Sequence, residues 1–117
     1  MFDTKFGLTV CENKGEFGGI LYVVTNNGIK LAGFGSYVFV FEYNDKVYGI
    51  TTLNHLLSYS CSLHEIRKSG DNFENITLFD SDDLNFAGYY AEDNYLYFYS
   101  VSAYNGLYRF DLDTNHL

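Results

Sequence analysis

The chain has 117 residues, of which 47% are hydrophobic and 19% charged, and its formal net charge at pH 7 is −8. This length fits one domain, 1–117, and the composition is that of a globular chain, which excludes intrinsic disorder. The acidic balance also argues against direct binding to nucleic acid, because such affinity normally comes from lysine and arginine on phosphates.

The apolar residues are dominated by tyrosine (12) and phenylalanine (11), and proline and tryptophan are absent. Aromatic and β-branched side chains pack well on pleated surfaces, so the composition favours strands. The first strands are expected over 6–12, 17–26 and 29–34. Asn27-Gly28 between the last two is a hairpin signal, since both residues tolerate positive φ.

A second hairpin is expected from strands over 37–43 and 46–51, with a two-residue turn at Asn44-Asp45. That turn places Phe41 opposite Tyr48 and Phe39 opposite Ile50, which gathers large apolar groups on one face.

The alternation breaks after residue 51. Leu53, Leu56 and Leu57 follow helical spacing, and Thr52 is a suitable capping residue. The pattern predicts one short helix over 52–57, followed by strands around 62–67, 75–79 and 86–91.

The last hairpin is expected to turn at Asn105-Gly106, which places Val101 opposite Phe110 and Tyr99 opposite Leu112. In this register one face is polar and carries Ser100, Ser102, Arg109, Asp111 and Asp113. The other face is apolar and predicted to be core, with Tyr95, Tyr97, Tyr99, Val101, Tyr108, Phe110 and Leu112.

Together these elements predict a mostly β fold, an antiparallel sandwich or barrel of about eight to ten short strands with one short helix. The first residues lack the basic-then-apolar layout of a signal peptide, and no apolar run is long enough to cross a bilayer. A cytoplasmic protein without membrane contact is expected, with Cys11 and Cys61 as free, small core residues.

Catalytic chemistry has few candidates. The possible participants, Cys11, Cys61, His55, His64 and His116, stand in no recognisable nucleophile motif, so the chain is not expected to be an enzyme or to carry a cofactor.

Metal binding is not expected either. Cys61 and His64 have the spacing of half a zinc site, but a second pair is lacking. The acidic stretch 80–85 begins like a calcium loop, yet Leu84 and Asn85 stand where a ligand and a glycine are needed.

The negative charge is confined to one part of the chain. Residues 1–69 hold six acids and six bases, whereas residues 70–117 hold nine acids and Arg109 alone. The basic residues show no cluster along the sequence beyond Arg67-Lys68. Acidic loops on both sides of the predicted strand 86–91, with aromatic residues beside them, favour a surface that binds a basic protein. The alternative interpretation is that these acids are solvated loop residues that only give solubility. The predicted partner-binding residues are Asp80, Asp82, Asp83, Tyr89, Tyr90, Glu92, Asp93, Tyr104 and Asp111.

With the acidic loops Asp80-Ser81-Asp82-Asp83 and Glu92-Asp93, this compact, aromatic-rich chain resembles the immunity proteins that neutralise bacterial nuclease toxins, including those of contact-dependent growth inhibition. The resemblance implies inhibition of one cognate toxin by covering its basic active-site cleft. Two alternatives stay open, a carbohydrate-binding β module using tyrosine, asparagine and aspartate side chains, and a subunit of a larger assembly that pairs through edge strands.

Overall fold

The computed structural model describes residues 1–13, 19–55, 58–84, 87–101 and 106–117. Within these residues the chain forms eleven β-strands and no helix, and so contains no helix that could span a membrane. The mostly β fold expected from the composition is confirmed, and the strands form three antiparallel sheets.

The N-terminal sheet has four strands in the order β1 (Phe2–Thr4), β2 (Gly7–Asn13), β3 (Gly19–Thr25) and β4 (Gly28–Phe34). The middle sheet also has four, β5 (Tyr37–Tyr43), β6 (Lys46–His55), β7 (Ser58–Ser69) and β8 (Asn72–Ser81). The C-terminal sheet has three, in the order β11 (Gly106–Asp111), β10 (Tyr95–Ser100) and β9 (Gly88–Glu92).

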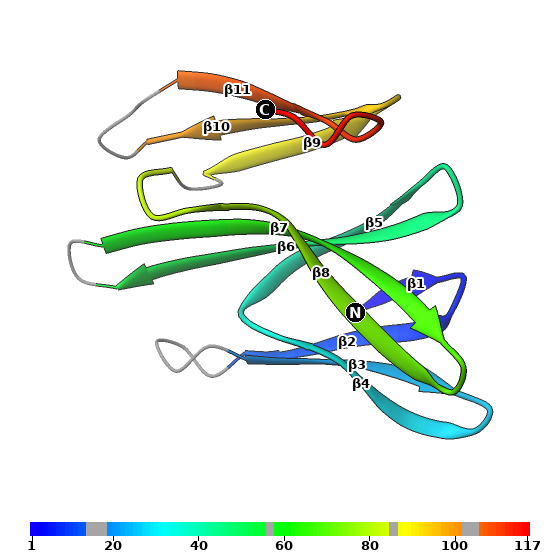
Figure 1. Ribbon diagram of the computed structural model, residues 1–117. Helices are drawn as coiled ribbons and strands as arrows, with labels where there is room; N and C mark the ends of the chain where they lie inside the picture. Colours follow the sequence, from blue (N-terminus) through cyan, green and yellow to red (C-terminus); the bar gives the residue numbers. More distant parts are fainter. Residues whose placement is uncertain (14–18, 56–57, 85–86, 102–105) are drawn as a thin grey trace.

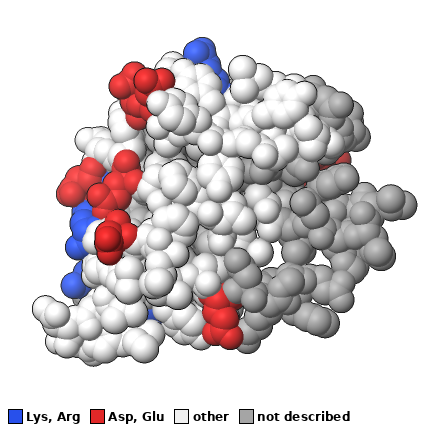
Figure 2. Space-filling view, turned by 180° about the vertical axis from the view of Figure 1, so that it is seen from behind, with Lys and Arg blue, Asp and Glu red and all other residues white. Residues whose placement is uncertain are grey.

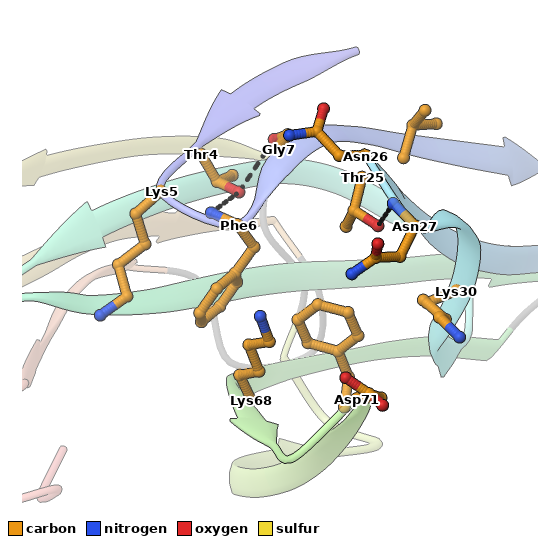
Figure 3. Close-up of a pocket in the computed structure, with 12 residues that line it drawn as sticks. Thr4, Lys5, Phe6, Gly7, Thr25, Asn26, Asn27, Lys30, Lys68 and Asp71 are labelled. Atoms are coloured by element: carbon orange, nitrogen blue, oxygen red, sulfur yellow. Dashed lines mark hydrogen bonds between the residues drawn. The ribbon is translucent and has the colours of Figure 1, made fainter.

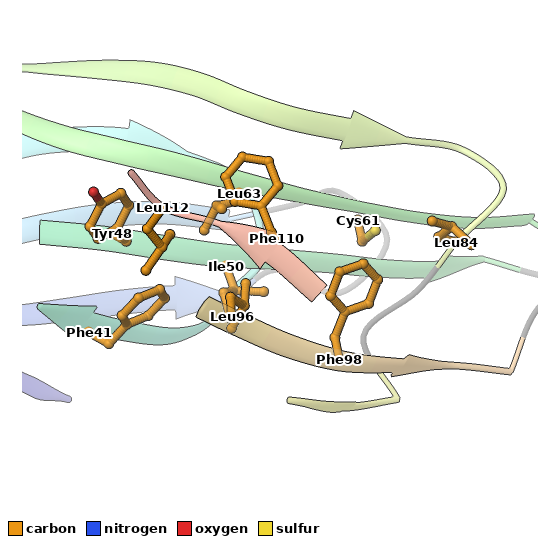
Figure 4. Close-up of a cluster of buried hydrophobic side chains, with 10 residues drawn as sticks. All are labelled: Phe41, Tyr48, Ile50, Cys61, Leu63, Leu84, Leu96, Phe98, Phe110 and Leu112. Atoms are coloured by element: carbon orange, nitrogen blue, oxygen red, sulfur yellow. The ribbon is translucent and has the colours of Figure 1, made fainter. Parts of the chain in front are cut away.

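The middle sheet lies between the other two (Figure 1). One of its faces packs through Ile50, Leu63 and their neighbours against Leu96, Phe98 and Phe110 of the C-terminal sheet (Figure 4). Its other face packs against the N-terminal sheet in a second core cluster of Leu21, Val23, Ala32, Tyr37, Val40, Val47 and Ile66. The middle sheet is therefore covered on both sides, and each outer sheet is covered on one.

Close packing of the middle sheet against the N-terminal sheet depends on Gly49. The buried ring of Tyr37 lies over this residue, and a Cβ on Gly49 would stand 2.6 Å from Cε1 of Tyr37. The Tyr37 hydroxyl accepts a hydrogen bond of 2.7 Å from Nδ2 of Asn75, which also donates to the carbonyl of Ala32 at 3.1 Å. Asn75 thus joins β8 to the adjacent strand β4.

The β5–β6 hairpin has the expected register. Asn44 and Asp45 form the turn with φ of 52° and 63°, and Phe41 pairs with Tyr48. In the preceding hairpin the strands end at Thr25 and resume at Gly28, so the turn is Asn26-Asn27, one residue before the expected position.

The short helix expected over 52–57 is wrong where the structure describes it. Residues 52–55 continue β6 and pair with β7, with Leu53 opposite Ser60 and His55 opposite Ser58. Backbone hydrogen bonds to a neighbouring strand here override the local leucine spacing. Residues 56 and 57 lie outside the described residues.

The register expected for the last hairpin is also wrong. Ser100 pairs with Gly106, and Tyr99 pairs with Leu107 rather than Leu112, a shift of five residues. Side chains of a strand alternate between the two faces of the sheet. A register that is wrong by an odd number of residues therefore pairs the residues of one face of β10 with those of the wrong face of β11. Leu96, Phe98 and Phe110 are the buried residues, while Tyr95, Tyr97 and Tyr99 lie on the outer face.

Candidate partner-binding surfaces

The outer face of the N-terminal sheet is almost entirely apolar. Three cross-strand rows of β2, β3 and β4 make up this face, and eight of their nine residues are apolar. The ninth is Glu12. We call the eight residues the apolar face: Leu8, Val10, Ile20, Tyr22, Val24, Ile29, Leu31 and Phe34.

Several side chains of the apolar face are open to solvent. Phe34 is 71% exposed and Ile29 68%, and Leu8, Val24 and Leu31 also count among the exposed apolar residues. An antiparallel sheet with one face in water usually alternates apolar and polar side chains. Here the buried residues Leu21 and Val23 alternate with apolar, outward-facing neighbours, so the pattern fits a sheet that another surface covers.

The outer face of the C-terminal sheet is aromatic and mixed with charge. Tyr97 pairs with Tyr90 on one side and with Arg109 on the other, so all three share this face. The Arg109 guanidinium lies 4.6 Å from the ring centroid of Tyr95, and the Tyr95 and Tyr97 centroids are 5.8 Å apart. We call this set the tyrosine face: Tyr90, Tyr95, Tyr97, Tyr99, Leu107 and Arg109.

The structure separates Tyr89 from Tyr90, two of the three tyrosines predicted to bind a partner. Tyr90 is 61% exposed on the tyrosine face. Tyr89 points to the inner side, where its ring stacks on Phe39 at 5.2 Å and its hydroxyl donates to the carbonyl of Val38 at 3.4 Å. Tyr104 lies outside the described residues.

Carboxylates gather at one end of the tyrosine face. Glu92 and Asp111 flank Tyr95 in the cross-strand pairing. Asp113 Oδ1 accepts a hydrogen bond of 2.9 Å from the Tyr43 hydroxyl, and this bond, with burial and the charges of Asp111 and Asp93, raises the pKa of Tyr43. We call Glu42, Glu92, Asp93, Asp111 and Asp113 the acidic end, where a hollow of 220 Å³ is lined by Phe41, Glu42, Tyr43, Ala91, Glu92, Asp93 and Leu112.

Asp111 has a structural part in this end of the molecule. Its Oδ1 accepts hydrogen bonds from Asn94 Nδ2 and from the backbone N–H groups of Asp113 and Thr114. Burial raises the pKa of Asp111, but these hydrogen bonds outweigh it and hold the pKa below its ordinary value. The hydrogen bonds from Asp113 and Thr114 therefore use the Asp111 carboxylate to hold the C-terminal turn in place.

Of the other predicted acids, Asp80 lies in β8 opposite Ser62, and Asp82 and Asp83 follow the end of β8, before β9 begins. All three are exposed, and the Ser81 hydroxyl accepts the backbone N–H groups of Asp83 and of the buried Leu84. Figure 2 shows acidic side chains in separate groups, with basic side chains beside some of them. The five-residue strand β9 spans about 17 Å, so the two acidic groups act as separate surfaces at physiological salt.

Three lysines far apart in the sequence meet at one cleft (Figure 3). The cleft has a volume of about 500 Å³ and lies among the β1–β2, β3–β4 and β7–β8 turns. Lys5, Lys30 and Lys68 line it, together with Asp71. This group could not be predicted from the sequence, because each lysine comes from a different hairpin.

His64 lies in a network of hydroxyl groups. Its Nε2 is 2.6 Å from the Ser62 hydroxyl, which also contacts Thr51, and its Nδ1 is 3.3 Å from the Thr77 hydroxyl. Burial lowers the pKa of His64. No carboxylate orients the ring through the hydrogen bonds found among the described residues, as a Ser–His–Asp arrangement would require.

Cys61 and His64 cannot share a metal ion. Cys61 packs in the core beneath the C-terminal sheet, whereas His64 contacts Tyr37 on the opposite face of the middle sheet. Neither Cys11 nor Cys61 is in a disulfide, and burial raises the pKa of Cys61 to about 12.

No family model, curated protein or solved structure matches this chain.

Proposed function

We propose that this chain is a non-catalytic binding domain that docks a partner protein on its apolar face. The observation that carries the proposal is the apolar face itself, eight apolar side chains on three adjacent strands with Glu12 as the one charged residue among them. Contiguous apolar patches on soluble domains mark interaction sites, because full burial of each large side chain contributes roughly 1.5–3 kcal/mol.

The partner on this face is a protein with a flat, apolar surface. A second β-sheet fits best, because sheets pack face to face at about 10 Å through interdigitating side chains. An aliphatic interface with so few charges is typical of permanent rather than transient contacts. The proposal thus agrees with a role as a subunit of a larger assembly, with contact through a sheet face rather than an edge strand.

A double variant tests this proposal, Ile29→Lys with Leu31→Lys. The partner that co-purifies with the wild-type chain is expected to be lost, because two charges would have to be desolvated at the interface. Tyr99→Lys on the opposite outer face is the matched control and is expected to retain that partner. Retention of the partner by the double variant, with thermal unfolding showing a folded chain, would contradict the proposal.

A second candidate function is the inhibitor of a basic enzyme, in its narrowest form an immunity protein that covers the cleft of a nuclease toxin. The outward orientation of the tyrosines favours it. Tyrosine side chains supply large anchoring areas at interfaces, and the acidic end supplies the charge that steers a basic partner. This function would use the tyrosine face, and not the apolar face.

Charge reversal at the two ends of β9 tests this candidate. Glu92→Lys with Asp93→Lys is expected to slow association with a purified basic partner about tenfold or more at low salt, since steering by charge changes rates strongly. Asp82→Lys with Asp83→Lys, at the other end of β9, provides the matched comparison and is expected to have the smaller effect. Equal association rates for the wild type and both variants would rule out charge steering.

Carbohydrate binding is the alternative use of the tyrosine face, since exposed aromatic rings also stack on sugars. Any ligand that binds only the folded chain must raise its thermal stability. A glycan panel that leaves the unfolding temperature of the wild type unchanged would remove this alternative.

A further inference from the structure

The cleft between the hairpin turns concentrates positive charge in a chain of net charge −8. Lys5 comes from the β1–β2 turn, Lys30 from the inner side of β4, and Lys68 from the end of β7. Asp71 is the one carboxylate among the residues that line the cleft. In the view of Figure 3, Lys5 and Lys30 lie on opposite sides of the cleft with Lys68 between them.

The three lysines differ in how far their charges are already compensated. The Lys5 amine lies 3.2 Å from Asp45 Oδ1 and donates to the Asp45 carbonyl at 2.6 Å, so its charge is partly balanced at the rim. The ion pairs found among the described residues involve Lys5 and Arg67, and not Lys30 or Lys68. These last two amines are therefore the ones that can meet an anion in the cleft.

The cleft also has an aromatic wall. Phe6 and Phe73 line it and contact each other edge to face, with ring centroids 5.2 Å apart. Both rings pack on the core cluster beneath the N-terminal sheet, which fixes their position. The rest of the lining comes from the β1–β2 and β3–β4 hairpins: Thr4, Gly7, Val24, Thr25, Asn26 and Asn27. Ligand sites commonly combine an apolar wall with a few convergent polar groups in a volume of about 300–1,000 Å³.

We propose that this cleft binds a phosphorylated ligand of nucleotide size, with its phosphates on Lys30 and Lys68 and its flat ring against Phe6 and Phe73. Lysine amines bind phosphate as compact point charges, and the volume of about 500 Å³ admits a ring together with its phosphates. The cleft shares only Val24 with the apolar face. Lys30 of the cleft and the apolar-face residues Ile29 and Leu31 point to opposite sides of β4, so the site can be tested separately from the proposed function.

Isothermal titration of the full chain with three probes tests this inference. ATP without added divalent cation is expected to bind saturably, inorganic pyrophosphate to bind more weakly, and adenosine to show no binding. Lys30→Gln with Lys68→Gln is expected to weaken ATP binding at least tenfold, whereas Lys46→Gln, a lysine outside the cleft, is expected to leave it unchanged.

Each contrary result overturns a defined part of the inference. Absence of saturable binding by both ATP and pyrophosphate would overturn the site. Equal weakening by the Lys46→Gln control would show non-specific attraction of anions instead of a built cleft. Pyrophosphate binding as tight as ATP would overturn the part assigned to the aromatic wall, and Phe73→Leu would then have no effect on ATP affinity.

Discussion

The two outer sheets of this molecule leave chemically different faces uncovered. The N-terminal sheet exposes aliphatic and aromatic side chains, with Phe34 and Ile29 about two-thirds exposed and Glu12 as the charged member. The C-terminal sheet exposes tyrosines together with Arg109, and carboxylates crowd one of its ends. Both sheets bury their inner faces against the same middle sheet, so the difference lies wholly in what each presents outward.

This difference indicates two kinds of contact. An aliphatic surface gains free energy simply from leaving water and suits a partner that stays bound. Tyrosine hydroxyls and charged groups remain well solvated when unbound, so the tyrosine face suits a partner that comes and goes. We therefore propose a permanent contact for the apolar face and reversible recognition for the tyrosine face.

The largest expected effect is a difference in the free energy of unfolding between substitutions on the buried face and on the outer face of one strand, β10. Phe98 is 1% exposed in the core, and its neighbour Tyr97 lies on the tyrosine face. Phe98→Ala is expected to lower the free energy of unfolding by about 3–5 kcal/mol, because it leaves a cavity. Tyr97→Ala is expected to change it by about 1 kcal/mol or less. Urea unfolding of both variants would measure this, and equal losses would contradict the assignment of faces.

The next effect tests how tightly the middle sheet meets the N-terminal sheet. Gly49→Ala is expected to lower the free energy of unfolding by about 1–3 kcal/mol, since the added methyl group meets the buried Tyr37 ring. Gly88→Ala is the control, because a Cβ at Gly88 would meet nothing within 4 Å. A loss at Gly88 as large as that at Gly49 would show that Tyr37 does not limit the packing.

A decline in stability at high pH tests the burial of Tyr37. Burial raises the pKa of Tyr37 from 10.0 to about 12, so the unfolded chain ionises first. The stabilisation is complete below pH 10 and is lost as the pH rises toward 12, by up to about 1.4 kcal/mol per pH unit for one proton. Tyr48, with its pKa raised by burial to about 12, acts in the same direction.

Urea midpoints measured from pH 9 to pH 12 would check this dependence. Tyr37→Phe removes one ionising group and is expected to flatten the decline, although it also removes the hydrogen bond from Asn75. An unchanged slope in Tyr37→Phe would show that another group controls the decline.

The smallest expected effect on stability concerns the apolar face. Ile29→Lys with Leu31→Lys is expected to change the free energy of unfolding of the isolated chain by about 1 kcal/mol or less, because both side chains are exposed. A loss above about 3 kcal/mol would mean that these side chains already pack within the chain.

The sequence predicted a hairpin correctly where a short turn controls it. Asn44 and Asp45 both adopt positive φ, and the two-residue turn fixes the pairing of β5 with β6 as far as Phe39 opposite Ile50, beyond which the register shifts before Tyr37. It failed for β10 and β11, since Asn105-Gly106 resembles a turn while β10 ends at Ser100 and pairs there with Gly106. The expected register differs from the observed one by an odd number of residues. It therefore put Tyr95, Tyr97 and Tyr99 on the same face as the buried Phe110 and wrongly predicted them to be core residues.

The candidate surfaces were less accessible to sequence reasoning. The apolar face does have a signal in the sequence, namely apolar residues at every position of 20–24 instead of an alternating pattern. The lysine cleft had none, because Lys5, Lys30 and Lys68 are brought together only by the packing of three hairpins. The acidic residues could be recognised from the distribution of charge along the sequence. That they form two groups, separated by the length of β9, depends on the fold.

The most direct test of the central proposal is site-specific photocrosslinking in the cells that make this protein. A photoreactive residue replaces Leu31 in one variant, Tyr97 in a second, and the exposed Asp82 in a third. A discrete adduct with one protein from the Leu31 position, and none from the Asp82 position, is the predicted result. Failure of the Leu31 position to form an adduct, with a discrete adduct from Tyr97, would contradict the assignment and identify the tyrosine face as the principal binding surface.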